Sequence, residues 1–327
     1  MRFHNFDLNL LVALDVLLKE RSVTRAAEVL SLSPSAISNS LSRLRAYFDD
    51  DLLVQIGRKM ELTPRAESLR EGVRDLLLRF DSTIAVPPAF APHDSDRTFR
   101  IFASDYTQLV LAPAMMTLAA RQRSTVRFEF APQVAAPHLD LERGEADLLI
   151  IPTGFMSPDH PREVLYQEGF VCMVWRDGAL ADGELTFDRF VAAEHVVMQP
   201  AGGRADAFEG WFLKRYGITR RVAVLTYSFI TLPALLVGTD RVATVHERVA
   251  RRLVGAWPLE IRPTPMKIDS MEQAMQWHKF RTKDPGLTWL RGLIVDAARR
   301  IDEFEFPEPQ TATGVCEDAA AGTVLGA

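Results

Sequence analysis

The chain has 327 residues, of which 47% are hydrophobic and 25% are charged. This composition excludes a disordered or fibrous protein, and the length predicts two or three globular domains at about 100 to 200 residues each. The net charge of −5 argues against a generally basic nucleic-acid binder. Residues 1–80, however, carry 12 Lys and Arg against 11 Asp and Glu, while the remainder carries 26 against 32. Any basic surface for nucleic acid is therefore confined to the N-terminal region.

Cysteine content and hydropathy predict a protein of the reducing cytoplasm. Cys172 and Cys316 do not form a C-x-x-C pair, so we expect no disulfide framework. Acidic residues interrupt the apolar run in 1–20, and no small-residue cleavage site follows, which favours an amphipathic helix over a signal peptide. No run of about 18 apolar residues predicts a membrane span.

Three short helices are predicted at the N-terminus. Leucines at helical spacing indicate a first helix over 6–20. Ser22 or Thr24 can cap a second helix over 24–30, whose alanines allow a neighbouring helix to approach closely. Ser33 can cap a third helix that has Pro34 at its first position, where a missing N–H has no cost.

A small hairpin and a longer helix follow. The apolar runs 52–56 and 60–62 flank Gly57-Arg58-Lys59, which predicts a hairpin with a basic tip. Pro64 opens a helix that extends to about residue 84. Its apolar stripe consists of Leu69, Val73, Leu76, Leu77, Phe80 and Ile84. A helix of this kind between two domains needs a partner, and a second copy of itself is the simplest one.

Beyond a proline-rich hinge over 86–96, the pattern changes to α/β. Strand-like runs occur at 98–104, 126–132, 146–154, 170–175, 195–200, 221–227 and 241–246. Helix-like runs occur at 104–122, 138–144, 187–193, 205–216, 229–238, 246–254 and 285–303. This alternation predicts βαβ units in mainly parallel sheets, and about 210 residues are enough for two α/β lobes with ligand groups at strand ends. Residues 306–327 have few large side chains, and we expect them to be disordered.

The segment 23–45 fits a helix-turn-helix. Ala27 is small where the two helices meet, Ser31 stands at the turn, and Leu32 is expected to plug the junction. Ile37 and Leu41 are then the buried residues of the second helix. Glycine is commoner at the turn, and a serine is tolerable there if its hydroxyl bonds locally.

The second helix keeps a face of small polar side chains, formed by Ser35, Ser38, Asn39 and Ser42. Such a face suits close approach to base edges in the major groove, with helix N-terminal amides near phosphate. The alternative is an ordinary pair of bundle helices. That alternative explains the leucines, but it explains neither the polar face nor the hairpin that follows it.

Residues 7–70 resemble the N-terminal domain of LysR-type transcriptional regulators, through RSVTRAAEVLSLSPSAIS, the DDDLLVQ–GR–LTPRA wing and the helix after it. The segments DLNLL, LSRLR and WHKFRTKDPGLTWLRGLI (277–294) resemble the NodD/NahR-like branch, which responds to aromatic inducers. The resemblance implies a winged helix-turn-helix domain, a dimerising linker helix with a hinge, and an effector domain of two α/β lobes like periplasmic binding proteins. The expected boundaries are 1–63 for the first, 64–96 for the second, 97–165 plus 270–305 for lobe I and 166–269 for lobe II. It also implies assembly as a homodimer or, more usually in the family, a homotetramer.

The residues expected to bind DNA are Ser33, Pro34, Ser35, Ser38, Asn39, Ser42, Arg43, Arg58 and Lys59. Pro34 departs from the family, which often has glutamine there, so Ser35, Ser38 and Asn39 would carry more of the base recognition. Arg43 and the wing residues would hold phosphates. Arg45, where most of the family has glutamate, is either a phosphate contact or a salt-bridge partner. Ser33 and Thr63 are equally well explained as caps.

Three segments are suited to an effector: ASDYT at 103–107, PAGGR at 200–204 and TYSFIT at 226–231. They combine strand ends, a helix N-terminus and close backbone access, which favour an anionic group, with aromatic residues that could pack a ring. With the family contacts added, the candidates are Ser104, Asp105, Tyr106, Thr107, Pro152, Thr153, Gly202, Gly203, Arg204, Ser228, Phe229 and His246, and Phe155 could also pack a ring. The alternative is that these are caps and turn residues. Under that alternative His246 caps a helix, and Asp147 ends a turn before a strand.

The sequence lacks G-x-S-x-G, G-x-x-x-x-G-K-[ST] and G-x-G-x-x-G, and its seven histidines lack metal spacing. We therefore expect no catalytic site, metal or cofactor. The favoured function is a cytoplasmic regulator that binds promoter DNA, a small aromatic effector, RNA polymerase and itself. The alternatives are an α/β enzyme for an aromatic compound with a DNA-binding appendage, and a constitutive architectural DNA binder. The sequence leaves the sign of regulation open.

Overall fold

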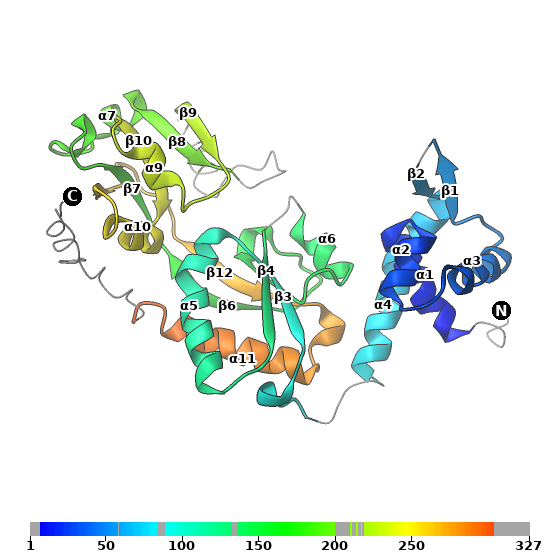
Figure 1. The fold of residues 1–327 in the computed structure, drawn as a ribbon. Helices are drawn as coiled ribbons and strands as arrows, with labels where there is room; N and C mark the ends of the chain where they lie inside the picture. Colours follow the sequence, from blue (N-terminus) through cyan, green and yellow to red (C-terminus); the bar gives the residue numbers. More distant parts are fainter. Residues whose placement is uncertain are drawn as a thin grey trace, which may run out of the picture.

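The structure is a computed structural model, and it describes residues 7–57, 59–83, 89–132, 136–199, 210, 214, 217 and 219–303. Figure 1 shows an N-terminal helical domain with a projecting hairpin, followed by two α/β lobes, each built on its own sheet. Most of the predicted helix over 205–216 and all of the tail over 306–327 lie outside the described residues. None of the described helices is long and apolar enough to cross a membrane.

The N-terminal domain has the predicted order of helices and hairpin. Its elements are α1 (Leu8–Glu20), α2 (Val23–Val29), α3 (Pro34–Phe48), β1 (Leu53–Ile56), β2 (Lys59–Leu62) and α4 (Pro64–Thr83). Ser22 is the cap of α2, because its hydroxyl accepts the Arg25 N–H at 3.3 Å, whereas Thr24 lies inside the helix. The predicted stripe of α3 is buried, with Ile37, Leu41 and Leu44 in one core with α1 and α2.

The turn between α2 and α3 differs from the prediction at one residue. Ser31 has φ 53°, in the left-handed region that usually favours glycine, and its N–H bonds the Glu28 carbonyl at 3.2 Å. Leu32 does not plug the junction, because it is 53% exposed. Ala26 and Ala27 are buried instead, in the core that α2 shares with α3, so the junction is filled without Leu32.

Lobe I is a five-stranded sheet in the order β4-β3-β5-β12-β6. Its strands are β3 (Thr98–Ala103), β4 (Arg127–Ala131), β5 (Leu148–Pro152), β6 (Arg162–Glu168) and β12 (Met271–Gln276). Its helices are α5 (Asp105–Arg121), α6 (Pro137–Glu142), α11 (Pro285–Arg299) and the short η2 (Pro92–Asp94), η3 (Thr153–Phe155) and η5 (Lys279–Arg281). The long α5 and α11 pack together and cover one face (Figure 1).

Lobe II is a second five-stranded sheet, in the order β11-β7-β10-β8-β9. Its strands are β7 (Phe170–Trp175), β8 (Glu194–Met198), β9 (Arg221–Thr226), β10 (Arg241–His246) and β11 (Leu259–Pro263). Its helices are α7 (Phe187–Ala192), α9 (Leu232–Leu236), α10 (Glu247–Val254) and the short η4 (Ala179–Ala181). One hydrophobic cluster runs from Phe99 and Met115 of lobe I to Phe229 and Val245 of lobe II, so the lobes share a core where they meet.

The prediction of mainly parallel sheets is only partly right. The βαβ strands β3, β4 and β5 are parallel, as are β8, β9 and β10. Antiparallel strands complete each sheet, since β12 pairs with β5 and β6, and β7 pairs with β10 and β11. The strands β6, β11 and β12 were not predicted, because polar residues interrupt them, as in MEQAMQ of β12, and no apolar run marks them.

Candidate DNA-binding face and effector cleft

The exposed face of α3 is the small polar face expected from the sequence. Ser35, Ser38, Asn39 and Ser42 are all exposed, at spacings of three and four that place them on one side of the helix. The opposite side is buried, so the polar face points away from the domain core. Ser40, between them, turns its hydroxyl back to the Ala36 carbonyl at 3.1 Å and has no free donor for DNA.

Ser33, Thr63 and Arg45 have clear structural partners. The Ser33 hydroxyl caps α3 through the Ala36 N–H at 3.2 Å and lies 2.9 Å from the Ser35 hydroxyl. The Thr63 hydroxyl accepts the Ala66 N–H and donates to Asp50 at 2.6 Å. The structure gives Arg45 a role within its own domain. Its guanidinium donates to the backbone carbonyls of Asp51 and Leu53, and so ties α3 to the wing.

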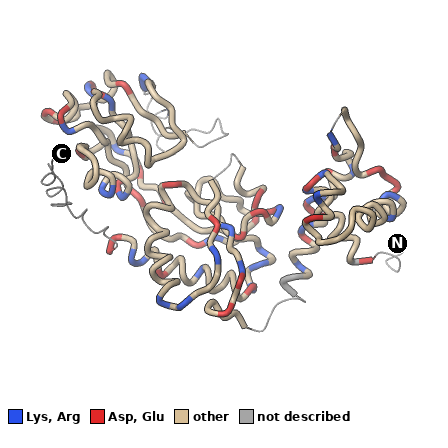
Figure 2. The backbone as a smooth tube through the Cα atoms, in the orientation of Figure 1, with Lys and Arg blue, Asp and Glu red and all other residues tan. Residues whose placement is uncertain are grey.

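Arg43 on α3 and Lys59 on the wing supply exposed positive charge. Arg43 is half exposed and lies 3.4 Å from Asp7, a contact loose enough for a phosphate to replace. Lys59 is exposed next to the hairpin tip, where Gly57 has φ 65°, whereas Arg58 lies outside the described residues. Figure 2 shows basic and acidic residues interspersed along the backbone of this domain, with an acidic segment after α3.

The N-terminus of α5 forms the lobe I side of the predicted effector site. Ser104 is the cap, because its hydroxyl accepts the Thr107 N–H at 3.3 Å and also contacts the Thr107 hydroxyl at 3.1 Å. Thr107 is buried and accepts a hydrogen bond from the Gln273 amide at 3.0 Å. The side-chain carbonyl oxygen of Gln273 is buried without a partner among the described residues. Pro152 and Thr153, half-buried at the end of β5, lie alongside, since Pro152 pairs in register with Gln273.

Lobe II meets this helix terminus directly. The Ser228 hydroxyl and the Ile230 N–H both donate to Asp105 Oδ2, at 2.7 and 3.2 Å. Four predicted residues that lie far apart in the sequence therefore come together: Asp105 and Tyr106 from lobe I, and Ser228 and Phe229 from lobe II. Gly202, Gly203 and Arg204 lie outside the described residues, and Phe155 is exposed on η3.

Aromatic rings fill the space beneath these polar contacts. The His246 ring lies 4.2 Å from that of Tyr106, 4.9 Å from Phe229 and 5.0 Å from Phe170, measured between centroids. Burial lowers the pKa of His246 to about 3, so the ring is neutral. His246 occupies the N-cap position of α10, but its side chain makes no capping hydrogen bond, which contradicts the cap alternative.

Glu168 supports this cluster, and the sequence analysis missed it. Its fully buried carboxylate accepts the Tyr106 hydroxyl at 2.6 Å, together with the N–H and the guanidinium of Arg248 at 3.0 Å. Burial, with Tyr166 and Glu168 alongside, raises the pKa of Tyr106 well above its usual value, so its hydroxyl stays a donor. A lone glutamate at the end of a polar strand gives no sequence pattern that would have identified it.

A winged helix-turn-helix followed by two α/β lobes that meet at strand ends and a helix N-terminus defines a ligand-controlled DNA-binding regulator. Residues 8–67 match the family described as bacterial regulatory helix-turn-helix protein, lysR family, and residues 92–299 match the LysR substrate binding domain. The chain belongs to the LysR family. It is a transcriptional regulator with a DNA-binding and an effector-binding domain, and it is not an enzyme.

Individual proteins agree with this assignment. The chain is 38% identical over 301 residues to nodulation protein D 1 of Rhizobium leguminosarum bv. phaseoli, covering 92% of this chain and 96% of that protein. A solved probable transcriptional regulator from Pseudomonas aeruginosa is similar at 28% identity and a TM-score of 0.61, covering 88% of this chain and 96% of the other. A full-length OxyR variant from the same organism shares the fold, with a TM-score of 0.69 at 16% identity over 90% of this chain and 95% of that one. The predicted LysR family is confirmed, and so is the predicted similarity to nodulation protein D.

Proposed function

We propose that the protein acts in the cytoplasm as an effector-controlled regulator that binds a dyad-symmetric promoter site as a homodimer or homotetramer. A helix-turn-helix dimer presents two recognition helices, which match two half-sites of a palindrome. The exposed Leu76 and Phe80 of α4 support a second copy as partner, because they are large apolar residues without cover in a single chain. RNA polymerase is the partner through which promoter geometry would act.

On the DNA side, α3 lies in the major groove in this proposal. Ser35, Ser38, Asn39 and Ser42 contact base edges, while Ser33 and Pro34 bring the helix N-terminus close to the backbone. Arg43 and the wing residues Arg58 and Lys59 hold phosphates. The support is the combination of exposure and small size: this face is uncovered in the folded domain and carries no large side chain that would hold the groove away.

On the effector side, the meeting of Asp105 with Ser228 above the ring cluster is the observation that carries the proposal. In this proposal a small aromatic acid or phenol enters between the lobes when Asp105 and Ser228 part, because the rings of Tyr106, Phe229 and His246 lie beneath that contact and would then be open to a ligand ring. Ser104, Thr107, Pro152, Thr153 and the segment Gly202–Gly203–Arg204 complete the proposed site. A ligand that separates Asp105 from Ser228 would change the angle between the lobes and shift the population of protomer arrangements.

A thermal-shift screen of the purified protein against aromatic acids, phenols and flavonoids, repeated with the DNA upstream of its own gene, tests this function. A true effector at 100 times its Kd adds roughly 2.7 kcal/mol of stability. Its affinity should change when DNA is present, because coupling between two sites is reciprocal. DNA binding without any aromatic hit would keep the regulator and reject the aromatic class of effector.

A further inference from the structure

The second half of α4 has two opposite sides with different surroundings. Leu76 and Phe80 are exposed on one side, where a second copy would pack in the proposed dimer. Arg74, Asp75 and Leu78 lie on the other side, because successive residues of a helix are turned by about 100°. This other side contacts lobe I, where α4 packs against α6 and η5. Docking on lobe I and pairing with a second copy can therefore coexist.

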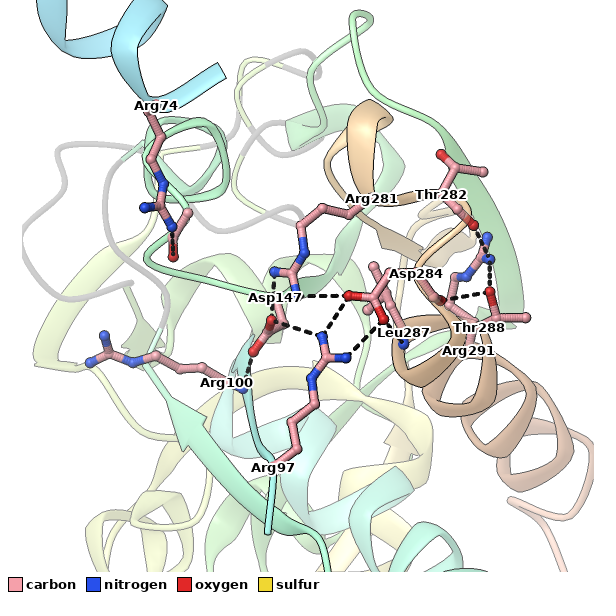
Figure 3. Close-up of polar contacts among 11 residues, drawn as sticks. Arg74, Arg97, Arg100, Asp147, Arg281, Thr282, Asp284, Leu287, Thr288 and Arg291 are labelled. Carbon is pink, nitrogen blue, oxygen red and sulfur yellow. Dashed lines mark hydrogen bonds and ion pairs between the residues drawn. The ribbon is translucent and has the colours of Figure 1, made fainter. Parts of the chain in front are cut away.

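The turn after α6 is shaped to receive the guanidinium of Arg74. Gly144 in this turn has φ 65°, and a Cβ added to it would lie 2.1 Å from Arg74 Nη2. Glycine alone combines this backbone conformation with this space. The guanidinium donates to the Gly144 carbonyl at 3.4 Å and to Asp15 of α1 at 2.9 Å. Figure 3 shows this side chain extending from α4 to the lobe, so Arg74 bridges the two domains.

The short helix η5 contacts the next turns of α4. Asp75 Oδ1 lies 3.3 Å from His278 Nε2, and the Arg79 guanidinium lies 4.0 Å from the ring centre of Phe280. His278 Nδ1 accepts the Phe280 N–H at 3.3 Å, so Nε2 is the donor that faces Asp75. The docked helix is therefore held at two places on lobe I, the Gly144 turn and η5.

An ion network fastens η5 to the central strands of lobe I (Figure 3). Arg281 of η5 lies 2.5 Å from Asp147 and 3.3 Å from Asp284. Arg97 donates two hydrogen bonds to Asp284, of 2.8 and 2.7 Å. Asp147 also accepts the Arg100 N–H of β3 at 2.7 Å. Asp147 is thus more than the end of a turn before β5, because it ties η5 to the sheet that α4 docks on.

The connection between α4 and lobe I is short. Residues 84–91 join Thr83, at the end of α4, to Pro92, where η2 begins. A chain of this length spans at most roughly 30 Å. It therefore keeps lobe I beside α4 of the same chain at an effective concentration of about millimolar order. This proximity favours docking within one chain over docking between two chains.

We propose that each DNA-binding domain docks on lobe I of its own chain, also within the oligomer, and that this docked form binds DNA. Docking leaves the recognition helix open, because α3 lies on the side of its domain away from the lobes (Figure 1). Each recognition helix thus takes its orientation from the effector domain of its own chain. The docking is independent of the proposed function, whereas its consequence for DNA rests on that function.

Cross-linking between α4 and α6 tests docking within one chain. Glu71 of α4 and Glu142 of α6 lie near each other, where burial and the charge of Glu71 raise the pKa of Glu142. The test protein carries Glu71→Cys, Glu142→Cys and Cys316→Ser, and it keeps Cys172, which is fully buried.

Oligomers assembled from a mixture of isotopically light and heavy chains are treated with a short bismaleimide. Peptide mass spectrometry then identifies the cross-link between residues 71 and 142. We expect cross-linked peptide pairs of a single isotope. Pairs that mix light and heavy peptides overturn the proposal, and so does the absence of this cross-link.

Two glycine variants test the role of the Arg74 contact. Gly144→Lys puts a side chain and a like charge where the Arg74 guanidinium lies. It should slow the cross-link about 10-fold, as expected when a charged group loses its hydrogen bond. Gly183→Lys is the matched control, because Gly183 has φ 70° and nothing within 4 Å of an added Cβ. Equal rates in the two variants, with folding checked by circular dichroism, overturn the proposal.

The cross-linked protein tests whether the docked form binds DNA. Its affinity for the DNA upstream of its own gene should stay within about twofold of the same protein before cross-linking, because the cross-link retains an existing arrangement. A larger loss in the cross-linked form alone overturns the assignment of the docked form to DNA binding. If neither form binds DNA, the proposed function fails instead, and the cross-link still decides the docking.

Discussion

Asp105 and Ser228 join the two lobes through a hydrogen bond of 2.7 Å, although 123 residues separate them in the chain. The carboxylate stands in the first turn of α5, where the helix dipole favours its negative charge. It also accepts the Ile230 N–H, so one side chain fixes a whole turn of lobe II. Opening the cleft therefore requires the release of this acid.

Ser228→Ala should loosen the lobes measurably. The substitution removes the hydrogen bond to the charged, partly buried Asp105. This hydrogen bond contributes about 1.5 kcal/mol to the free energy of unfolding of the effector domain. Urea unfolding measures this loss. The matched control is Thr231→Ala, because the Thr231 hydroxyl donates to the Ser228 carbonyl within lobe II. Equal losses in the two variants would contradict a specific role for the inter-lobe bond.

Ser38→Ala should change which DNA sequences the protein prefers. Its exposed hydroxyl is placed to reach base edges, so its loss should relax the preference at one position of each half-site, at about 1 kcal/mol. Selection from a randomised operator library measures the effect. Ser40→Ala, two residues away with its hydroxyl bonded inside the helix, should leave the preference unchanged. A uniform loss of affinity across sequences in Ser38→Ala would remove this residue from the base-recognition face.

Arg43→Ala should weaken binding to all sequences alike and lower the slope of log affinity against log salt by about one unit, as expected for one lost phosphate contact. Titrations at several salt concentrations measure the slope. Arg45→Ala is the matched control two residues on. Because Arg45 bonds two backbone carbonyls of its own domain, its loss should reduce stability and leave the slope unchanged. An unaltered slope in Arg43→Ala would count against a phosphate contact.

Leu76→Asp should produce monomers. Leu76 is 56% exposed on the free face of α4, so an aspartate there costs the single chain little but places charge in an apolar interface between copies. Sedimentation velocity measures the outcome. Glu67→Gln, on the opposite side of the same helix and paired with Arg70 at 2.8 Å, should keep the wild-type assembly. A dimer that survives Leu76→Asp would place the interface elsewhere.

Asp284→Asn should change stability in a pH-dependent way. Burial alone would raise the pKa of Asp284, but the hydrogen bonds and charge of Arg97 outweigh it and lower this pKa to about 2. An ionised Asp284 therefore stabilises the fold above about pH 4, and this contribution disappears as the pH falls toward 2. The difference in unfolding free energy between wild type and variant should shrink by roughly 2 kcal/mol over that interval. Asp296→Asn, at an exposed pair, should show no such change.

The N-terminal domain could be predicted closely because its elements depend on local rules. Caps, alanine spacing and the Ile37–Leu41–Leu44 stripe are set within one or two turns of chain. The exposure of Leu32 could not be predicted this way, because it depends on how closely α2 and α3 approach. The apolar stripe of α4 likewise looked continuous, yet Val73 faces the core and Leu76 faces solvent.

The candidate effector site could be predicted by segment but not by partner. Strand ends and a helix N-terminus identified Ser104, Asp105 and Ser228. No local sequence pattern identifies Glu168 or Gln273, because their hydrogen-bond partners Tyr106 and Thr107 lie far away in the chain.

The position of β12 determines the order in which the protein can be completed on the ribosome. This strand lies between β5 and β6, although all of lobe II is encoded between β6 and β12. Lobe II can therefore close during synthesis, whereas lobe I must wait with an open sheet until residue 276 has emerged. The helix-turn-helix domain is translated before both lobes. A nascent chain would thus have a finished DNA-binding domain before it has a finished sensor.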